Sequence, residues 1–151
     1  MTLLDVEVVK ATRSAAPAAF IRRSLQRAAS LPELEARLPE GRPAVAVRVT
    51  THDELQRLNH TYAGEDHATD VLSFAGAGEH LGDIAISWPA VVRQAASYGH
   101  DERTEVALLA VHSLLHLLGW DHASASERRE MTRLTVSALR LSGVTLARGR
   151  L

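Results

Sequence analysis

Three histidines fall within one short segment of the chain. The segment VHSLLHLLGWDH covers residues 111–122 and holds His112, His116 and His122. His112 and His116 are four residues apart in an apolar helical pattern, so their side chains share one face and can bind a single ion. Gly119 can end that helix in a left-handed conformation, which would turn His122 back toward the same point. The segment therefore predicts a metal site.

Three neutral imidazoles would leave one position of a tetrahedral ion open to water, as is typical of catalytic zinc. Bound zinc lowers the pKa of water from about 15.7 to about 7 and stabilises negative charge on a carbonyl or phosphoryl oxygen. We therefore expect one Zn²⁺ per chain and a hydrolytic reaction, although imidazole also suits nickel, copper and iron. The alternative is a set of core histidines bonded to the backbone. It fits less well, because burying two imidazoles on the most apolar helix is costly without a partner.

The spacing HxxxHxxGxxH resembles that of the metzincin peptidases, in which a glutamate directly after the first histidine acts as the general base. In this chain the corresponding residue is Ser113. A serine hydroxyl is a poor proton acceptor at neutral pH, so a peptidase would keep the metal geometry and lack its base.

Other motifs precede and follow the histidine segment. The chain carries TDVLSF at residues 69–74 and LGDI at residues 81–84, with Leu58, Asn59 and Tyr62 before them and Met131 after the histidines. In these motifs and their order, over roughly residues 55–131, the chain resembles the YbeY family of bacterial metal-dependent endoribonucleases.

This resemblance implies a zincin-like α+β fold, in which a small mixed β-sheet packs with helices and the metal site lies at the end of a central helix. It implies His112, His116 and His122 as metal ligands. It also implies cleavage of single-stranded RNA in ribosomal RNA maturation and ribosome quality control, with the ribosome or ribosomal proteins as partners.

One position departs from the family pattern. The arginine that usually follows the tyrosine of the LNxxY segment is Ala63 in this chain. A phosphoryl-transfer site gains from a cation that stabilises charge in the transition state, so either another arginine takes this role or activity is weak. The candidates are Arg57, Arg93, Arg128 and Arg129. The departure keeps a second function open, a metal-stabilised ribosome-assembly factor with little catalysis.

Further site residues are expected around the motifs. Asp70 could orient a histidine through its second N–H or could cap a turn. Asp121, beside His122, could orient a histidine, assist the attacking water or simply be solvated. Together with Arg57 they form the predicted catalytic set. Phe74 could offer a stacking surface to a base, although alternating core and surface positions explain a strand residue almost as well. The residues expected to line the substrate cleft are Asn59, Thr69, Ser73, Phe74 and Asp83.

Composition limits the other possibilities. The 151 residues are 46% hydrophobic and 23% charged, which fits one domain over residues 1–151. A formal charge of −1 excludes the overall positive charge of a sequence-blind nucleic-acid binder. The absence of cysteine excludes disulfides and thiolate metal sites.

Asp5 and Glu7 interrupt the first apolar run, and the longest apolar stretch is too short for a membrane span, so we expect a cytoplasmic protein. The oligomeric state stays open.

The hydrophobic pattern predicts the elements that position these residues. Strands are expected at residues 3–9, 44–50, 71–74 and 81–87, and helices at residues 17–29, 53–62, 88–98, 102–118 and 126–141. A loop is expected at residues 63–68, and the basic end at residues 147–151 is expected to fray. Strands dominate the first half and helices the second, which favours an α+β domain.

Overall fold

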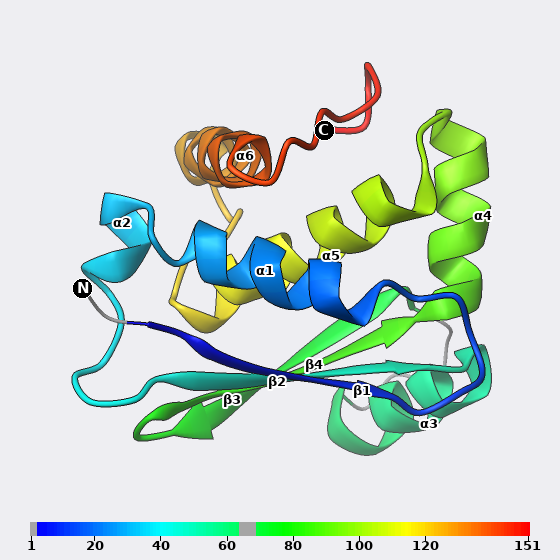
Figure 1. The fold of residues 1–151 in the computed structure, drawn as a ribbon, viewed down its shortest axis with the longest axis horizontal. Coiled ribbons are helices and arrows are strands. Elements are labelled where there is room, and N and C mark those ends of the chain that lie inside the picture. Colours follow the sequence, from blue (N-terminus) through cyan, green and yellow to red (C-terminus); the bar gives the residue numbers. More distant parts are fainter. Residues whose placement is uncertain (1–2, 64–68) are drawn as a thin grey trace.

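In the computed structural model, the described residues form four strands that alternate with three helices up to residue 87, and three further helices follow (Figure 1). The structure describes residues 3–63 and 69–151, so most of the loop predicted at residues 63–68 lies outside the described residues. The side chain of Ala63 lies outside them as well. The elements are β1 (Asp5–Lys10), α1 (Ala18–Ala28), α2 (Pro32–Glu35), β2 (Ala44–Thr50), α3 (His52–Ala63), β3 (Val71–Ala77), β4 (His80–Ser87), α4 (Trp88–Tyr98), α5 (Glu102–Leu117) and α6 (Ala125–Arg140).

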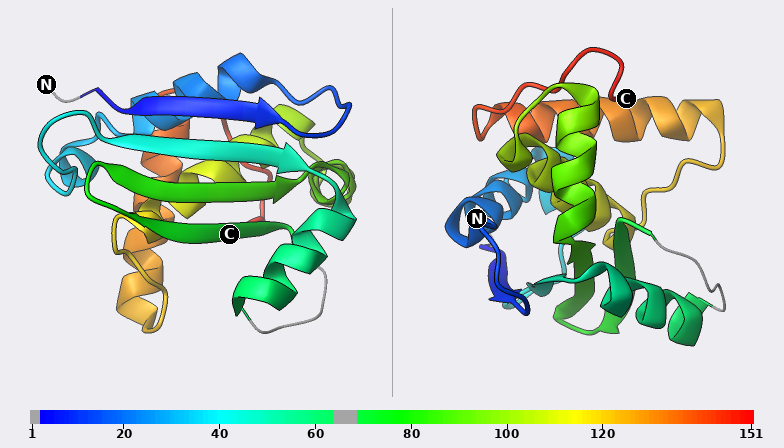
Figure 2. Two further views of the ribbon diagram at one scale, coloured as in Figure 1. Left: turned by 90° about the horizontal axis from the view of Figure 1, so that it is seen from below. Right: turned by 90° about the vertical axis from the view of Figure 1, so that its right-hand side faces the viewer.

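The strands form one mixed sheet in the order β1-β2-β4-β3 (Figure 2). β1 pairs parallel to β2, and β2 pairs parallel to β4. β3 pairs antiparallel to β4, with Ser73 opposite Ile84 and Phe74 opposite Asp83, and forms one edge of the sheet. The predicted α+β fold with a small mixed sheet is confirmed.

One face of the sheet carries the core. Successive strand residues point to opposite faces, and the buried residues Val45, Val47 and Val49 of β2 alternate accordingly, whereas β4 is buried continuously from Ile84 to Ser87. Helices α1, α5 and α6 lie on this side of the sheet, whereas α3 lies on the other side (Figure 1). The buried side chains that meet between sheet and helices include Val45, Val47, Val49, Ile84 and Ile86 of the strands and Phe20, Ile21 and Leu25 of α1.

Helix α5 is the central helix. Its residues from Val106 to Val111 are buried without a break, which is the pattern of a helix covered on all sides. It packs against α1, α4 and α6 as well as against β3 and β4. The helix begins at a cap in which Asp101 Oδ1 accepts a hydrogen bond from the backbone N–H of Thr104 at 2.8 Å. α5 is therefore fixed both at its start and along its length.

The last turn of α5 packs closely on the sheet at Gly82 in β4. A β-carbon at this position would overlap the carbonyl oxygen of Phe74 and would lie 2.8 Å from Leu117 Cδ2. Its φ of +154° is also a conformation that other residues rarely adopt. Glycine thus lets β3, β4 and the end of α5 approach one another.

Two features were not expected from the sequence. The four-residue helix α2 was not predicted, and the basic end does not fray as predicted. Arg150 instead donates hydrogen bonds to Glu105 of α5 at 3.0 Å and 2.7 Å.

No helix among the described residues is long and apolar enough to cross a membrane.

Candidate metal centre

Helix α5 presents His112 and His116 on one face near its C-terminal end. Both side chains are half-buried, and their ring centroids are 4.9 Å apart. The spacing of four residues places the rings one turn apart. Ser113, which follows His112, is buried at 2% exposure. The residue at the position of the metzincin base is thus a buried serine.

A tight turn after α5 brings the third histidine back. Gly119, with φ of +99°, donates its N–H to the carbonyl of His116 at 3.0 Å, and Trp120 donates its N–H to the carbonyl of Leu115 at 3.0 Å. These bonds satisfy carbonyls that the helix end would otherwise leave unpaired. The chain then continues to His122, which is close enough to face the helix.

The three imidazoles converge on one point. The ring of His122 has its centroid 6.1 Å from that of His112 and 5.1 Å from that of His116. One nitrogen from each ring lies within 4.8 Å of the other two. A donor set of three imidazoles at this spacing could hold a metal ion.

Hydrogen bonding fixes the orientation of one of these rings. His116 Nδ1 lies 3.1 Å from the carbonyl oxygen of Trp120. A carbonyl oxygen can only accept, so Nδ1 carries the proton and Nε2 keeps its lone pair for a metal. Ligating histidines commonly donate their other N–H to a carboxylate or carbonyl group in this way. The partner here is a backbone carbonyl, whereas the sequence suggested a carboxylate.

The surroundings of His112 and His116 favour the neutral form of both rings. Burial lowers the pKa of His112 to about 4, helped by repulsion from His116, His122 and Arg150. Burial also lowers the pKa of His116, followed by repulsion from His122, and its bond to Trp120 and the charge of Asp121 oppose this only partly. Neutral imidazole is the form that binds metal, so the two helix residues are in the binding form at neutral pH.

The two predicted carboxylates lie in different places. Asp121 is 65% exposed, and its Oδ1 accepts the backbone N–H of His122 at 2.7 Å and lies 3.7 Å from His122 Nδ1. Asp70 Oδ2 instead accepts a hydrogen bond from Gln94 of α4 at 3.1 Å, and its backbone carbonyl accepts from Ser87. The structure thus brings Asp121 to the histidines, and it holds Asp70 against α4.

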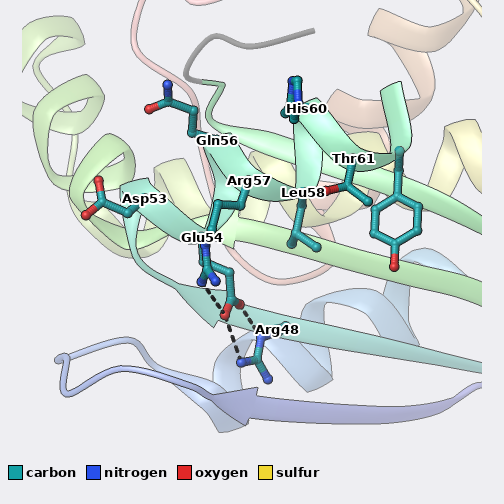
Figure 3. Close-up of a pocket in the computed structure, with 9 residues that line it drawn as sticks. Arg48, Asp53, Glu54, Gln56, Arg57, Leu58, His60 and Thr61 are labelled. Atoms are coloured by element: carbon teal, nitrogen blue, oxygen red, sulfur yellow. Dashed lines mark hydrogen bonds and ion pairs between the residues drawn. The ribbon is translucent and has the colours of Figure 1, made fainter. Parts of the chain in front are cut away.

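Arg57 belongs to a separate group of charges on α3. Its side chain is 75% exposed, and its Nη2 lies 3.6 Å from Glu54 Oε2 (Figure 3). Glu54 also forms an ion pair with Arg48 of β2. These residues line a pocket of about 700 Å³ whose other lining residues all come from α3. The structure therefore does not place Arg57 with the histidines. Arg93, Arg128 and Arg129 are exposed.

The predicted cleft residues fall on two faces of the sheet. Phe74 and Asp83 are opposite one another and share a face, on which they line a cavity of about 840 Å³ with Arg48, Leu58 and Tyr62. Ser73 also contributes to this lining.

By its pairing with the buried Ile84, the side chain of Ser73 belongs to the face on which α5 packs. Asn59 is buried in α3, and Thr69 lies just before β3 with its hydroxyl 3.5 Å from the carbonyl of Val71.

A buried ionic network that the sequence did not reveal lies on α5 before the histidines. Glu105 is fully buried and pairs with Arg150 of the C-terminal segment, whose guanidinium also stacks on Tyr98 at 4.5 Å. His100 Nδ1 accepts the N–H of Ala147 at 3.1 Å, so its Nε2 donates to Glu105 at 2.7 Å.

The network lies on the helix face that carries the candidate metal ligands, because Glu105 precedes His112 by seven residues, or about two turns. One signal could have revealed it: a carboxylate at the start of a helix this apolar needs a partner.

Known proteins are similar to this chain over most of its length. A model of the family described as "Endoribonuclease YbeY" matches residues 7–142. The chain belongs to the YbeY family.

A curated YbeY relative from Chloroflexus aurantiacus is 43% identical over an alignment that covers 76% of this chain and 86% of the relative. One from Roseiflexus sp. is 37% identical and covers 94% of both chains. The solution structure of TM1509 from Thermotoga maritima has the same fold, with a TM-score of 0.60 and 19% identity over 97% of this chain and 99% of that one.

Proposed function

We propose that this YbeY chain is a metal-dependent endoribonuclease that cleaves single-stranded RNA. The curated relatives carry the name endoribonuclease, which supports a hydrolytic nuclease with RNA as its substrate. The observation that carries the proposal is the convergence of His112, His116 and His122 within 4.8 Å. We further propose the cytoplasm as the compartment and ribosomal RNA maturation and ribosome quality control as the process, with the ribosome or ribosomal proteins as partners.

We propose zinc as the ion, one per chain. Three imidazole ligands, one of them oriented by a backbone carbonyl, fit zinc and leave a position for substrate. When bound, zinc supplies Lewis acidity toward the scissile phosphate. Metal analysis of purified protein tests this choice, and nickel or iron at one ion per chain in place of zinc would contradict it.

The carboxylate of Asp121 is proposed to act as the general base of the reaction. Its Oδ1 is held by the backbone N–H of His122, so the group stays beside the ligands and open to solvent. There it can accept a proton from the attacking group, either a water or the 2′-hydroxyl of the RNA, as that oxygen bonds to phosphorus and the P–O bond to the leaving ribose oxygen breaks. Asp70 keeps a supporting role in this proposal, as it fixes the start of β3 to α4 through Gln94. An Asp121→Asn variant with unchanged kcat would exclude the proposed proton transfer.

The RNA strand is proposed to run along the edge strand β3. Ser73 lies on its α5 side, and Phe74 lies on the opposite face beside Tyr62, with a ring-centroid distance of 5.3 Å. Tyr62 is exposed and Phe74 is half-buried. Accessible aromatic rings bind unpaired bases by stacking, which would favour single-stranded RNA over duplex. Thr69, Asp83 and Arg57 are proposed to border this path, whereas Asn59 is buried in α3 and does not face it. A Phe74→Leu variant should raise KM for RNA about tenfold, and an unchanged KM would exclude base stacking at this ring.

The absence of the family arginine favours a second function. Ala63 replaces the family arginine, and Arg57 is paired with Glu54. A chain with this arrangement could bind ribosomal RNA or ribosomal proteins as an assembly factor while cleaving little.

Cleavage of end-labelled RNA separates these functions. Metal-loaded wild type and an identically purified His116→Ala variant are compared on single-stranded and duplex RNA. Cleavage of the single strand by the wild type alone supports the endoribonuclease and excludes a contaminating nuclease. Absence of cleavage with stoichiometric metal in the wild type would support the assembly factor.

A further inference from the structure

Arg37 makes two contacts with the turn that carries the metal ligands. It lies just after α2, and its Nη1 donates a hydrogen bond to the carbonyl oxygen of Leu118 at 3.2 Å. Its guanidinium carbon lies 3.5 Å from the ring centroid of Trp120. The two contacts flank Gly119, the residue at which the chain reverses after α5. A single side chain, 81 residues away in sequence, thus holds both sides of the turn.

Arg37 is itself held in place by its own segment. Leu34 of α2 is fully buried, and Arg37 donates its backbone N–H to the carbonyl of Leu34 at 3.0 Å. Leu38, next along the chain, packs against the core. The guanidinium group therefore extends from an anchored backbone, although the residue as a whole is exposed.

Trp120 transmits this restraint to a metal ligand. Its ring is nearly buried, and its Nε1 donates to Glu130 Oε1 at 3.3 Å. Its carbonyl oxygen accepts the Nδ1 proton of His116 at 3.1 Å. Movement of the Trp120 peptide would take away the partner that orients His116 and would also shift His122, two residues further on.

We propose that Arg37 is a positioning residue for the metal centre. By stacking on Trp120 and bonding Leu118, it fixes the carbonyl that sets the His116 tautomer. The stack and the bond both use the planar guanidinium, which a lysine ammonium cannot reproduce in full. This inference rests on the proposed metal site, because positioning matters only if the histidines bind an ion.

The test measures metal binding and coordination as well as folding. Zn²⁺ affinity is determined by competition with a chromophoric chelator, and the Co²⁺ absorption spectrum reports the coordination geometry. Arg37→Met keeps an apolar stem without the guanidinium, and Arg37→Lys keeps the charge. Arg42→Met is the matched control, because Arg42 is exposed in the same connection between α2 and β2.

We expect Arg37→Met to bind Zn²⁺ about tenfold more weakly, the lower end of the losses seen when groups that orient metal ligands are removed. Its Co²⁺ spectrum should change, and Arg37→Lys should recover part of the affinity. The melting temperature of the metal-free protein should match that of Arg42→Met.

Either of two results would overturn the proposed role of Arg37 and leave the proposed metal centre intact. One is wild-type Zn²⁺ affinity in Arg37→Met. The other is a lower melting temperature with an unchanged Co²⁺ spectrum, which would make the contact purely structural. A wild type that binds neither ion would instead overturn the metal centre, and this inference with it.

Discussion

The guanidinium group of Arg150 donates two hydrogen bonds to the carboxylate of Glu105, from Nε to Oε1 at 3.0 Å and from Nη2 to Oε2 at 2.7 Å. Glu105 is fully buried, and 13% of the Arg150 side chain is exposed. The pair links the last residues of the chain to the central helix. Because Arg150 is also one cause of the lowered pKa of His112, the C-terminal segment contributes to the surroundings of the metal centre.

Loss of Arg150 should destabilise the fold. An Arg150→Met substitution would leave the Glu105 carboxylate buried with His100 as its remaining partner in the network. Removing one member of a buried ion pair costs about 3 kcal/mol in the free energy of unfolding. Urea denaturation measures the change. Arg148→Met is the control, because Arg148 is exposed in the same segment. Equal stability of the two variants would show that Glu105 does not depend on Arg150.

Stability of the metal-free protein should fall in mild acid. The pKa of His112 is lowered from 6.5 to about 4 by burial and by its charged neighbours. Between these two values the unfolded chain takes up a proton that the folded chain does not, so stability falls as pH drops through this window. The loss due to His112 at pH 5 is about 2 kcal/mol at most.

Urea denaturation at pH 7 and pH 5 checks the acid effect against a His112→Gln variant. The variant should lose less stability over the same interval, because the titrating ring is gone. His116 is lowered in the same direction, so part of the pH dependence should persist in the variant. The same loss in both proteins would assign the pH dependence to other groups.

Zinc should stabilise the protein through His122. A ligand present at 100 times its dissociation constant adds about 2.7 kcal/mol to the free energy of unfolding. His122→Ala should lose this gain and keep the stability of the metal-free form, because its side chain is 55% exposed. Thermal melts with Zn²⁺ and with a chelator measure both quantities. His60→Ala, at an exposed position on α3, should respond to zinc like the wild type. A full zinc response in His122→Ala would remove this residue from the ligand set.

Restoring the family arginine should raise activity. An Ala63→Arg substitution adds a cation at the end of α3. A cation positioned to stabilise the transition state of phosphoryl transfer contributes at least about tenfold to kcat. Initial rates on single-stranded RNA measure the effect, with Ala63→Gln as a control of similar length without the charge. Unchanged or lower cleavage by Ala63→Arg would contradict the placement of the substrate near the end of α3.

Local patterns predicted much of this structure. The alternation of Val45, Val47 and Val49 indicated a strand with one buried face, and the histidine spacing with Gly119 indicated a helix, a turn and three neighbouring rings. Each of these depends on residues a few positions apart, where backbone geometry is regular. The order of the strands depends instead on pairing between distant segments, which local patterns do not encode.

The unpredicted features depend on contacts between distant residues. Arg150 meets Glu105 across 45 residues and Arg37 meets Leu118 across 81, and no periodicity in the sequence encodes such pairs. Helix α2 has only four residues, too few for a helical repeat to stand out. The sequence suggests Asp70 as a partner of a histidine, whereas its hydrogen bond to Gln94 depends on how α4 packs beside β3.

The close packing around Gly82 limits which residues can replace it. The space for its side chain is taken by the carbonyl of Phe74 and by Leu117, the last residue of α5 and the neighbour of His116. A substitution there would have to move either an edge strand or the helix end that carries the candidate metal ligands. Substitution of this strand residue is therefore coupled to the position of the candidate metal ligands, and even alanine should be rare at residue 82 in functional variants.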